Sequence, residues 1–413
     1  GTVTGVTGTF SNIQNLMGGS GADTYTFNNG ATEISVDGGT GANTLNLSAY
    51  STATNVSITA PGSVGYNGTA TGITGFSNMG TLTGSATAIN TLTGDASGAM
   101  YTLTAANGGT LQDTGSAQVL NFGSFQSLVG GSGADNFVLA GGSVDSITGG
   151  GGNDTLTGDN SGDTFNITGS NSGVVTSGAT TLVGAFSNVQ NLTGGAGNDG
   201  FVFQGSGSLS GNVNGGSGSN TLNYAALAGP VNVTLSSSSS GTGSQIGGTF
   251  SGIGILVGSA GSDMLTGPNT ANTWTINGTN AGNVDGFNFS SIESLTGGSG
   301  SNSFLFSGSS SLSGNINGGS GAATGNSLQG NNSANTWSVT GANQGTVTGL
   351  GGTFTNIGNL IGGTGTDNFI FANGASLSGS LNGGGVASGN DAIDWSAYTT
   401  ARRSEEHTSE LQS

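Results

Sequence analysis

The sequence contains no cysteine and no lysine, and Lys and Arg together number only 2 among 413 residues. Without cysteine the chain can form no disulfide framework, which is compatible with an extracellular or a cytosolic protein. Without a cationic surface it cannot neutralise phosphates, so nucleic acids and anionic lipids are excluded as partners. No apolar run approaches the roughly 18 residues of a membrane span, so no membrane insertion is expected.

Charge and proline are also scarce, while glycine is abundant. Only 5% of the residues are charged, 3 are Pro and 86 are Gly, and the formal net charge is −18. Gly, Ser, Thr and Asn favour turns and strands over helices. The composition therefore predicts an all-β protein whose acidic balance suits cations better than anions.

The last residues differ abruptly in composition from the rest of the chain. The only basic residues and most of the Glu residues fall there: Arg402, Arg403, Glu405, Glu406, His407 and Glu410. Residues 403–413 resemble the in-frame translation of a short sequencing adapter. We interpret them as a non-native, disordered tail and exclude them from the fold. The absence of an initiator Met and of a signal segment at Gly1 indicates a natural start further upstream.

An internal repeat organises the rest of the sequence. A motif of the type F-S-N-x-x-x-L recurs seven times and defines seven blocks. The blocks start at Phe10, Phe76, Phe122, Phe186, Phe250, Phe289 and Phe354. Every third copy of the motif is followed by a similar sequence. Phe10, Phe186 and Phe354, which begin three such copies, are separated by 176 and 168 residues. The blocks therefore form a super-repeat of about 170 residues, and residues 1–402 are predicted to form one continuous array.

Within the blocks, a Gly-rich turn recurs about every 20 residues and is followed by a strand with alternating apolar side chains. Examples are residues 24–27 and 44–47. Such a 20-residue coil cannot bury its apolar stripe alone, but stacked coils can share one core. The pattern predicts an elongated parallel β-helix, or β-solenoid. Periodic Phe, Leu and Ile argue against the alternative of a disordered Gly/Ser linker.

Two residue types in the repeats have predicted structural roles. The motif residues Asn12, Asn78, Asn188 and Asn356 are expected at equivalent turns, where Asn tolerates the left-handed conformation and can bond between coils. Trp274 and Trp337 occupy equivalent positions and are expected in the core instead of on a sugar-stacking surface.

Five Gly-rich turns match the pattern GGxGxD. They are residues 18–23, 130–135, 149–154, 194–199 and 362–367. This turn resembles the calcium-binding nonapeptide of RTX proteins, in which Asp side chains and Gly carbonyls of stacked turns enclose the ion. RTX arrays repeat the nonapeptide back to back, whereas most copies here stand about 20 residues apart and equivalent turns carry Asn instead.

One stretch is richer in candidate ligands for calcium, which needs about six to eight oxygens. A second turn follows residues 149–154 directly and adds Asp159 and Asp163 to Asp154, with Asp135 one coil earlier. We predict Asp135, Asp154, Asp159 and Asp163 as metal ligands and Ca²⁺ as the cofactor. The structural alternative is that these residues only shape the turns.

The text of the array resembles giant bacterial β-strand-repeat surface proteins of the adhesin, filamentous-hemagglutinin-like and RTX-like type. The resemblance implies a secreted stalk or surface-display segment of an adhesin or biofilm protein, located outside the cell. Its partners would be glycans or proteins of the cell surface or matrix, bound by regions outside this sequence.

Catalysis is not expected, because Ser has no usable His or Lys to activate it. Two alternatives stay open: a calcium-binding RTX-like β-roll, and a β-helix polysaccharide lyase or hydrolase with converging carboxylates.

Overall fold

The computed structural model describes residue 7, residues 9–385 and residues 390–399. The predicted all-β class is confirmed, because the described residues form 42 strands and one short 3₁₀ helix, η1 (Ala323–Gly325). The strands belong to two sheets of 21 strands each, in which parallel pairing dominates. None of the described residues forms a helix long and apolar enough to cross a membrane. The predicted non-native tail, residues 403–413, lies outside the described residues.

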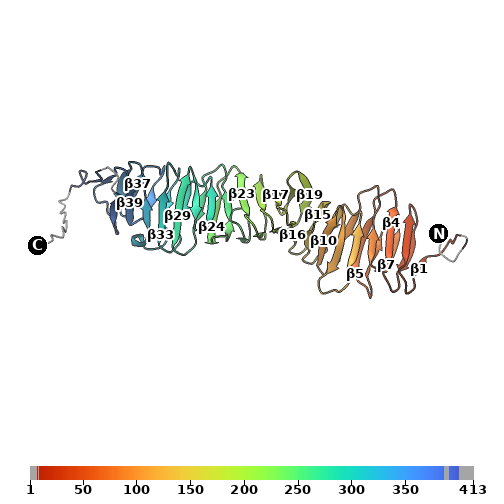
Figure 1. Ribbon diagram of the computed structural model, residues 1–413. Helices are drawn as coiled ribbons and strands as arrows, with labels where there is room; N and C mark the ends of the chain where they lie inside the picture. The colour runs from red at the N-terminus through yellow and green to blue at the C-terminus, as the bar shows by residue number, and fades with distance from the viewer. Residues whose placement is uncertain (1–6, 8, 386–389, 400–413) are drawn as a thin grey trace. The chain divides into compact units, whose positions relative to one another are not determined.

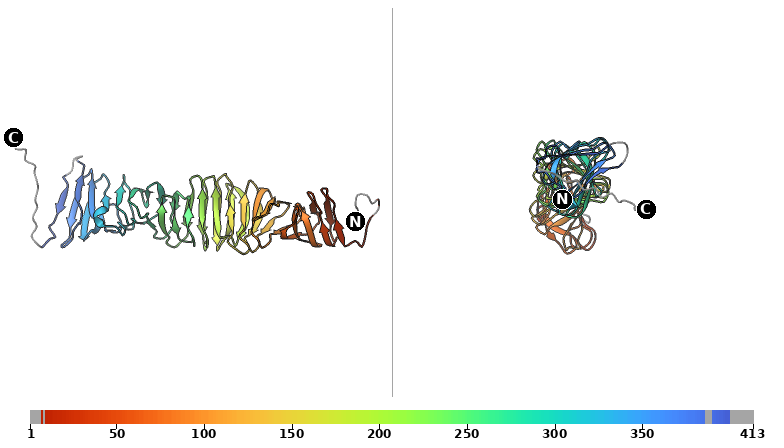
Figure 2. Two further views of the ribbon diagram at one scale, coloured as in Figure 1. Left: turned by 90° about the horizontal axis from the view of Figure 1, so that it is seen from below. Right: turned by 90° about the vertical axis from the view of Figure 1, so that its left-hand side faces the viewer.

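The chain divides into two compact units. The first contains residues 1–228 and 239–255, and the second contains residues 229–238 and 256–413. Figures 1 and 2 show the strands of each unit lying side by side.

In the first unit, sheet 1 contains, in spatial order, β1 (Asn15–Met17), β3 (Glu33–Asp37), β7 (Ile73–Met79), β6 (Tyr66–Ala70), β5 (Asn55–Pro61), β9 (Thr91–Thr93), β13 (Ser127–Val129), β15 (Val144–Thr148), β19 (Thr180–Ser187), β18 (Ser172–Ser177), β17 (Thr164–Gly169), β21 (Gly200–Gln204) and β23 (Thr221–Ala226). Sheet 2 of this unit contains β2 (Thr24–Asn28), β4 (Thr44–Ala49), β8 (Thr81–Thr83), β12 (Leu120–Gly123), β11 (Gly108–Asp113), β10 (Ala99–Ala105), β14 (Asn136–Leu139), β16 (Thr155–Thr157), β20 (Asn191–Gly195), β22 (Val213–Gly216), β26 (Phe250–Ser251) and β25 (Ser240–Gly243).

In the second unit, sheet 1 contains β27 (Ile255–Val257), which begins at the boundary, followed by β31 (Phe287–Ser290), β30 (Ala281–Val284), β29 (Asn272–Gly278), β33 (Asn302–Phe306), β35 (Ser327–Gln329), β39 (Asn359–Gly363) and β41 (Leu381–Gly384). Sheet 2 of this unit contains β24 (Asn232–Ser237), β28 (Met264–Thr266), β32 (Ser294–Thr296), β34 (Ile316–Asn317), β38 (Phe354–Thr355), β37 (Gln344–Val347), β36 (Thr336–Gly341), β40 (Asn368–Phe371) and β42 (Ala392–Asp394).

Outside the antiparallel meanders described below, successive strands alternate between the two sheets, so each of these coils contributes one strand to each sheet. Parallel neighbours follow at the predicted spacing in several places: β1 pairs with β3 through Asn15 and Ser35, and β13 pairs with β15 through Ser127 and Ser146. The Gly-rich turns connect one sheet to the other. The 20-residue spacing therefore corresponds to the step between stacked parallel strands.

Other coils are longer because they contain a three-stranded antiparallel meander, which the sequence analysis did not predict. In the first unit the meanders are β5–β6–β7, β10–β11–β12 and β17–β18–β19. In the second unit they are β29–β30–β31 and β36–β37–β38. In each meander the chain moves forward along the sheet and then returns. Parallel partners such as Asn55 and Thr91 are therefore 36 residues apart.

The recurring Phe lies on the last strand of each meander, and in four of these five meanders its ring covers a glycine on the middle strand. Phe186 pairs with Gly173, and Phe354 pairs with Gly345. A Cβ added to either glycine would lie 2.9 Å from the ring's Cζ atom. Aromatic side chains shield strand glycines in this way and replace the missing side-chain contacts. This packing explains why the repeat keeps Phe at this position.

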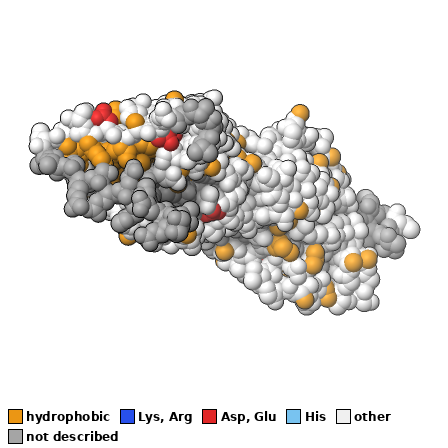
Figure 3. Space-filling view, turned by 60° about the vertical axis from the view of Figure 1, so that its left-hand side comes forward, with side chains coloured by type: hydrophobic (Ala, Val, Ile, Leu, Met, Phe, Trp, Pro, Cys, Tyr) orange, Lys and Arg blue, Asp and Glu red, His pale blue; other side chains and the backbone are white. Residues whose placement is uncertain are grey.

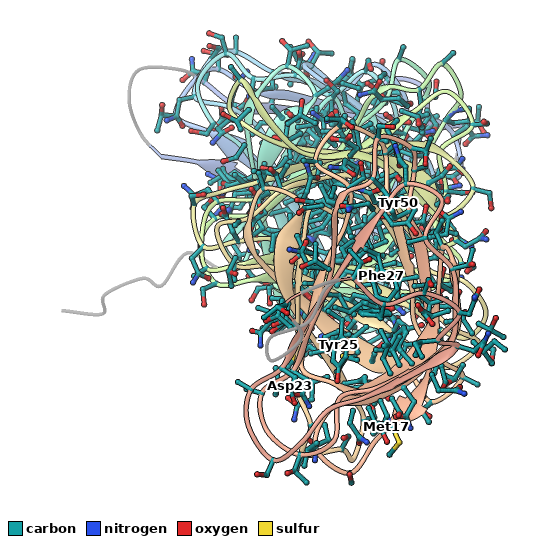
Figure 4. The ribbon with its side chains drawn as sticks, turned by 90° about the vertical axis from the view of Figure 1, so that its right-hand side faces the viewer. Met17, Asp23, Tyr25, Phe27 and Tyr50 are labelled. Atoms are coloured by element: carbon teal, nitrogen blue, oxygen red, sulfur yellow. The ribbon has the colours of Figure 1, made fainter. Side chains whose placement is uncertain are left out.

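The apolar face of each strand is buried between the sheets. The predicted core positions of Trp274 and Trp337 are confirmed, because both side chains are fully buried and stack on Phe304 and Phe369 of the next coil. In Figure 4, Phe27 lies inside the first coil and Met17 lies at its outer rim. The face drawn in Figure 3 is nearly free of charge, with a few acidic side chains among uncharged ones.

The repeated motif forms the sharp corner between the sheets. Its third residue has a positive φ in all seven copies: Asn12, Asn78, Ser124, Asn188, Gly252, Ser291 and Asn356 have φ between 52° and 65°. The predicted left-handed conformation of the four Asn residues is confirmed. The corner at Asn188 separates Phe186 in β19 from Leu192 in β20, so two residues of one motif fill the core from opposite sheets.

Replacing Asn188 by Val should destabilise the first unit by about 1–2 kcal/mol, because a β-branched residue resists the left-handed conformation. Asn188→Gly should lose much less. Urea denaturation followed by circular dichroism measures both. Equal losses in the two variants would show that the corner depends on the Asn side chain and not on its φ.

Candidate functional site

A ladder of buried Asp and Asn side chains lines the turns. Each member lies just before a strand, at the end of a Gly-rich turn. In most members a side-chain oxygen accepts the backbone N–H of the equivalent residue one coil earlier. The members that accept a backbone N–H from the preceding coil include Asn43, Asp135, Asp154, Asp199, Asn220, Asp263, Asn326 and Asp367. Oδ1 of Asp154 accepts from Asp135 at 2.8 Å, and Oδ1 of Asn220 accepts from Asp199 at 2.8 Å. These bonds satisfy backbone donors at the point where the sheet ladder ends.

In some ladder Asp residues the second side-chain oxygen closes the turn of its own coil. Oδ2 of Asp135 accepts the N–H of Gly131 at 2.9 Å, and Oδ2 of Asp163 accepts the N–H of Asp159 at 2.7 Å. At some corners that lack an Asp or Asn at this position, the side-chain oxygen of a Gln accepts the backbone N–H instead. Gln126 accepts from Asn90 at 2.8 Å. The ladder therefore continues across both kinds of turn.

Asp135 and Asp154, two of the predicted metal ligands, lie in neighbouring coils. They precede β14 and β16, which are parallel neighbours in sheet 2. Their side chains are 2% and 0% exposed. Both occupy turns that lead from sheet 1 to sheet 2.

Asp159 and Asp163 lie in a turn that runs in the opposite direction, from β16 in sheet 2 to β17 in sheet 1. Asp159 is half-buried and accepts the N–H of Ser161 at 2.6 Å. The structure thus places the four predicted ligands in two pairs at opposite turns. The nine residues between the two turns carry the chain through one strand, from one edge of the sheets to the opposite edge. Two turns on the same edge are instead separated by a full coil.

Asp199 is the partner of Asp163 in the next coil, and the sequence analysis did not select it. The N–H of Asp163 donates to Oδ1 of Asp199 at 2.7 Å. The turn of Asp199 carries the same GGxGxD signal. However, the meander β17–β18–β19 separates it from the turn of Asp163, so the sequence alone did not identify the two turns as neighbours. Among the described residues, no group of three or more acidic, His or Cys side chains could hold a metal ion. Calcium binding stays a prediction.

Burial raises the pKa of several ladder carboxyl groups. The pKa of Asp135 and that of Asp163 rise to about 6, mainly because burial disfavours the charge, while hydrogen bonds from backbone N–H groups oppose the rise. All Lys, Arg and His side chains of the chain lie at positions 402–407, outside the described residues. Within the described part of the chain, protonation and backbone N–H donors, and not basic side chains, offset these buried charges.

The carboxyl group of Asp113 is more strongly perturbed than those of Asp135 and Asp163. Asp113 ends β11 and is 2% exposed, and no N–H or hydroxyl group of the described residues donates to either of its carboxyl oxygens. Its pKa rises to about 7, first through burial, then through the charge of Asp95, a hydrogen bond with the Asp95 carboxyl group and the charge of Asp135. Two carboxyl groups this close share a proton more readily than both ionise.

Asp113→Asn should raise the free energy of unfolding by about 1–3 kcal/mol at about pH 8, because it removes a buried unpaired charge. The folded chain holds this proton more tightly than the unfolded chain. Its contribution is therefore fully present below the ordinary pKa of 3.8 and is lost as the pH rises toward about 7. The variant and the wild type should differ little near pH 4.

Urea titrations across this pH range measure the effect. Asp145→Asn is the control, because Asp145 lies exposed on β15. A difference between the Asp113 variant and the wild type that does not change with pH would contradict the assignment.

Comparisons with known proteins give no family for the chain. No model of a protein family matches it, and no curated protein matches it either.

Proposed function

We propose that this chain is a β-solenoid segment that serves as a structural stalk or surface-display element of a large secreted bacterial protein of the adhesin type. It has no catalytic role in this proposal. The observation that carries the proposal is the alternation of the chain between two sheets, with parallel strands in register from one coil to the next.

The architecture supports a spacer function. Each coil adds at least one strand to each sheet and extends the buried core, so length increases without a new type of core. The side chains that repeat are those that build the coil: the corner residue with positive φ, the Phe over its glycine and the Asp/Asn ladder. A sequence that repeats its structural residues is typical of a spacer whose length matters more than any single site.

The roles of the carboxyl groups support a non-catalytic assignment. Asp135, Asp154 and Asp199 each use an oxygen to accept a backbone N–H of the preceding coil, and Asp163 accepts the N–H of Asp159 in its own turn. These groups are committed to holding coils together. Location outside the bacterial cell, and partners among surface or matrix glycans and proteins bound by other regions, rest on the resemblance to adhesins.

A calcium-loaded β-roll is the second candidate. The observation that favours it is the pair of buried carboxyl groups of Asp135 and Asp154 in neighbouring coils, because calcium in stacked turns is bound by carboxylate and carbonyl oxygens. A polysaccharide lyase or hydrolase is a third possibility, and turnover of acidic or neutral glycans would be its evidence.

Circular dichroism with chelator and with millimolar calcium separates the first two candidates. The stalk proposal predicts the same β-sheet signal and the same thermal midpoint in both conditions, because the coils are held by backbone bonds and apolar packing. A sheet signal that appears only with calcium would overturn it and support the β-roll. Asp154→Asn, compared with Asp145→Asn, then tests whether the predicted ligand is responsible.

A further inference from the structure

The ladder accepts either Asn or Asp at equivalent positions, although the two differ in what their second atom can do. The Asn members donate with Nδ2 to a carbonyl oxygen of the next coil. Asn220 donates to Gly252 at 2.9 Å, and Asn302 donates to Gly318 at 2.9 Å. An ionised Asp has no proton to donate at this position.

Asp367 occupies the same position in the second unit, before β40. Its Oδ1 accepts from the backbone N–H and from Nδ2 of Asn335, at 2.9 and 2.7 Å. The side chain is fully buried, and its Oδ2 has no hydrogen-bond partner. The carboxyl group is therefore satisfied on one side only.

The neighbouring glycine shows what the free oxygen faces. A Cβ on Gly362 would collide with both Oδ2 of Asp367 and the carbonyl oxygen of Gly383 in the next coil. A Cβ on Gly297 would likewise collide with Nδ2 of Asn302 and the carbonyl oxygen of Gly318, two atoms that are hydrogen-bonded. Oδ2 of Asp367 thus lies where an Asn would donate to a carbonyl oxygen.

Two acceptors facing each other in a buried place cost free energy unless a proton lies between them. The charged group that faces Asp367 from the next coil is Asp391, whose Oδ1 accepts the N–H of Asp367 at 2.9 Å. It has the same sign. From the preceding coil the uncharged Asn335 faces Asp367, and no described residue is basic.

We propose that Asp367 is a neutral carboxylic acid in the folded protein, and that its Oδ2–H donates to the carbonyl oxygen of Gly383 as the amide of Asn302 donates to Gly318. The contact between the coils of β40 and β42 is then a pH-sensitive joint. It is complete when Asp367 is protonated and is weakened when the proton leaves. The joint is independent of whether the array serves as a stalk.

The pKa of Asp367 shifts in the direction that this joint requires. Burial raises it, hydrogen bonds from Asn335 oppose the rise, and the charge of Asp391 adds to it. Because the folded pKa lies above the ordinary value of 3.8, the joint contributes fully in acid. It is lost as the pH rises through the folded pKa.

The test is Asp367→Asn, which supplies a donor at every pH. The readout is amide hydrogen exchange of β42, whose residue Ala392 donates its N–H to the carbonyl of Asp367 at 2.9 Å. Variant and wild type are compared at equal pH, so that intrinsic exchange rates cancel. We expect about 5–30-fold slower exchange in the variant at about pH 8 and no difference near pH 4. Equal exchange at both pH values would overturn the proposal.

The reverse substitution, Asn302→Asp, should weaken the coil of β33 at about pH 8 and leave it unchanged near pH 4. Asp145→Asn again serves as the control for loss of an exposed charge. Carboxyl ¹³C NMR of Asp-labelled wild-type protein, with the Asp367 signal assigned by its absence in the variant, reports protonation directly. A signal that titrates at the ordinary pKa would contradict the proposal, as would protection of β42 that depends on added calcium at about pH 8.

Discussion

The structure depends on one interaction, the hydrogen bond from a backbone N–H at the start of a strand to the side chain of the equivalent residue one coil later. Asp135 and Asp154 show it in the first unit, and Asn335 and Asp367 in the second. Without these side chains each turn would leave a buried donor unpaired, which is costly. Since every bond joins two successive coils, the ladder also fixes the register in which the apolar strands stack.

The same interaction explains why the glycines recur at fixed places. Gly149 and Gly362 leave the space that the carboxyl groups of Asp154 and Asp367 occupy, and a Cβ at either position would collide with that side chain and with a carbonyl oxygen of the next coil. The Gly and the Asp of the turn are therefore one packing unit. A protein that places so many acids inside, with its basic residues outside the described part, links the stability of its coils to protonation.

Sequence reasoning succeeded where one residue type reports one local conformation. Asn188 and Asn356 identified left-handed corners, and the recurring Gly-rich turns gave the spacing between parallel neighbours such as β13 and β15. Sequence reasoning missed the meanders, because the antiparallel return strands have the same Thr- and Gly-rich sequence as the parallel strands. It also placed Asp154 and Asp163 in one site, although they lie on opposite turns. Spacing along a chain does not reveal on which side of a two-sheet coil a turn lies.

The corners after Phe76, Phe122 and Phe186 lead in turn from sheet 1 to sheet 2, back to sheet 1 and again to sheet 2. The super-repeat contains three blocks, an odd number, so a given sequence position changes sheet from one super-repeat to the next: the motif at Phe10 leads into β1 of sheet 1, and its equivalent at Phe186 leads into β20 of sheet 2. One outward-facing residue, repeated once per super-repeat, would consequently decorate the two outer surfaces alternately. A longer array with this sequence repeat would display such a residue in one row on each outer surface. Within a row, successive copies would be two super-repeats apart in the sequence.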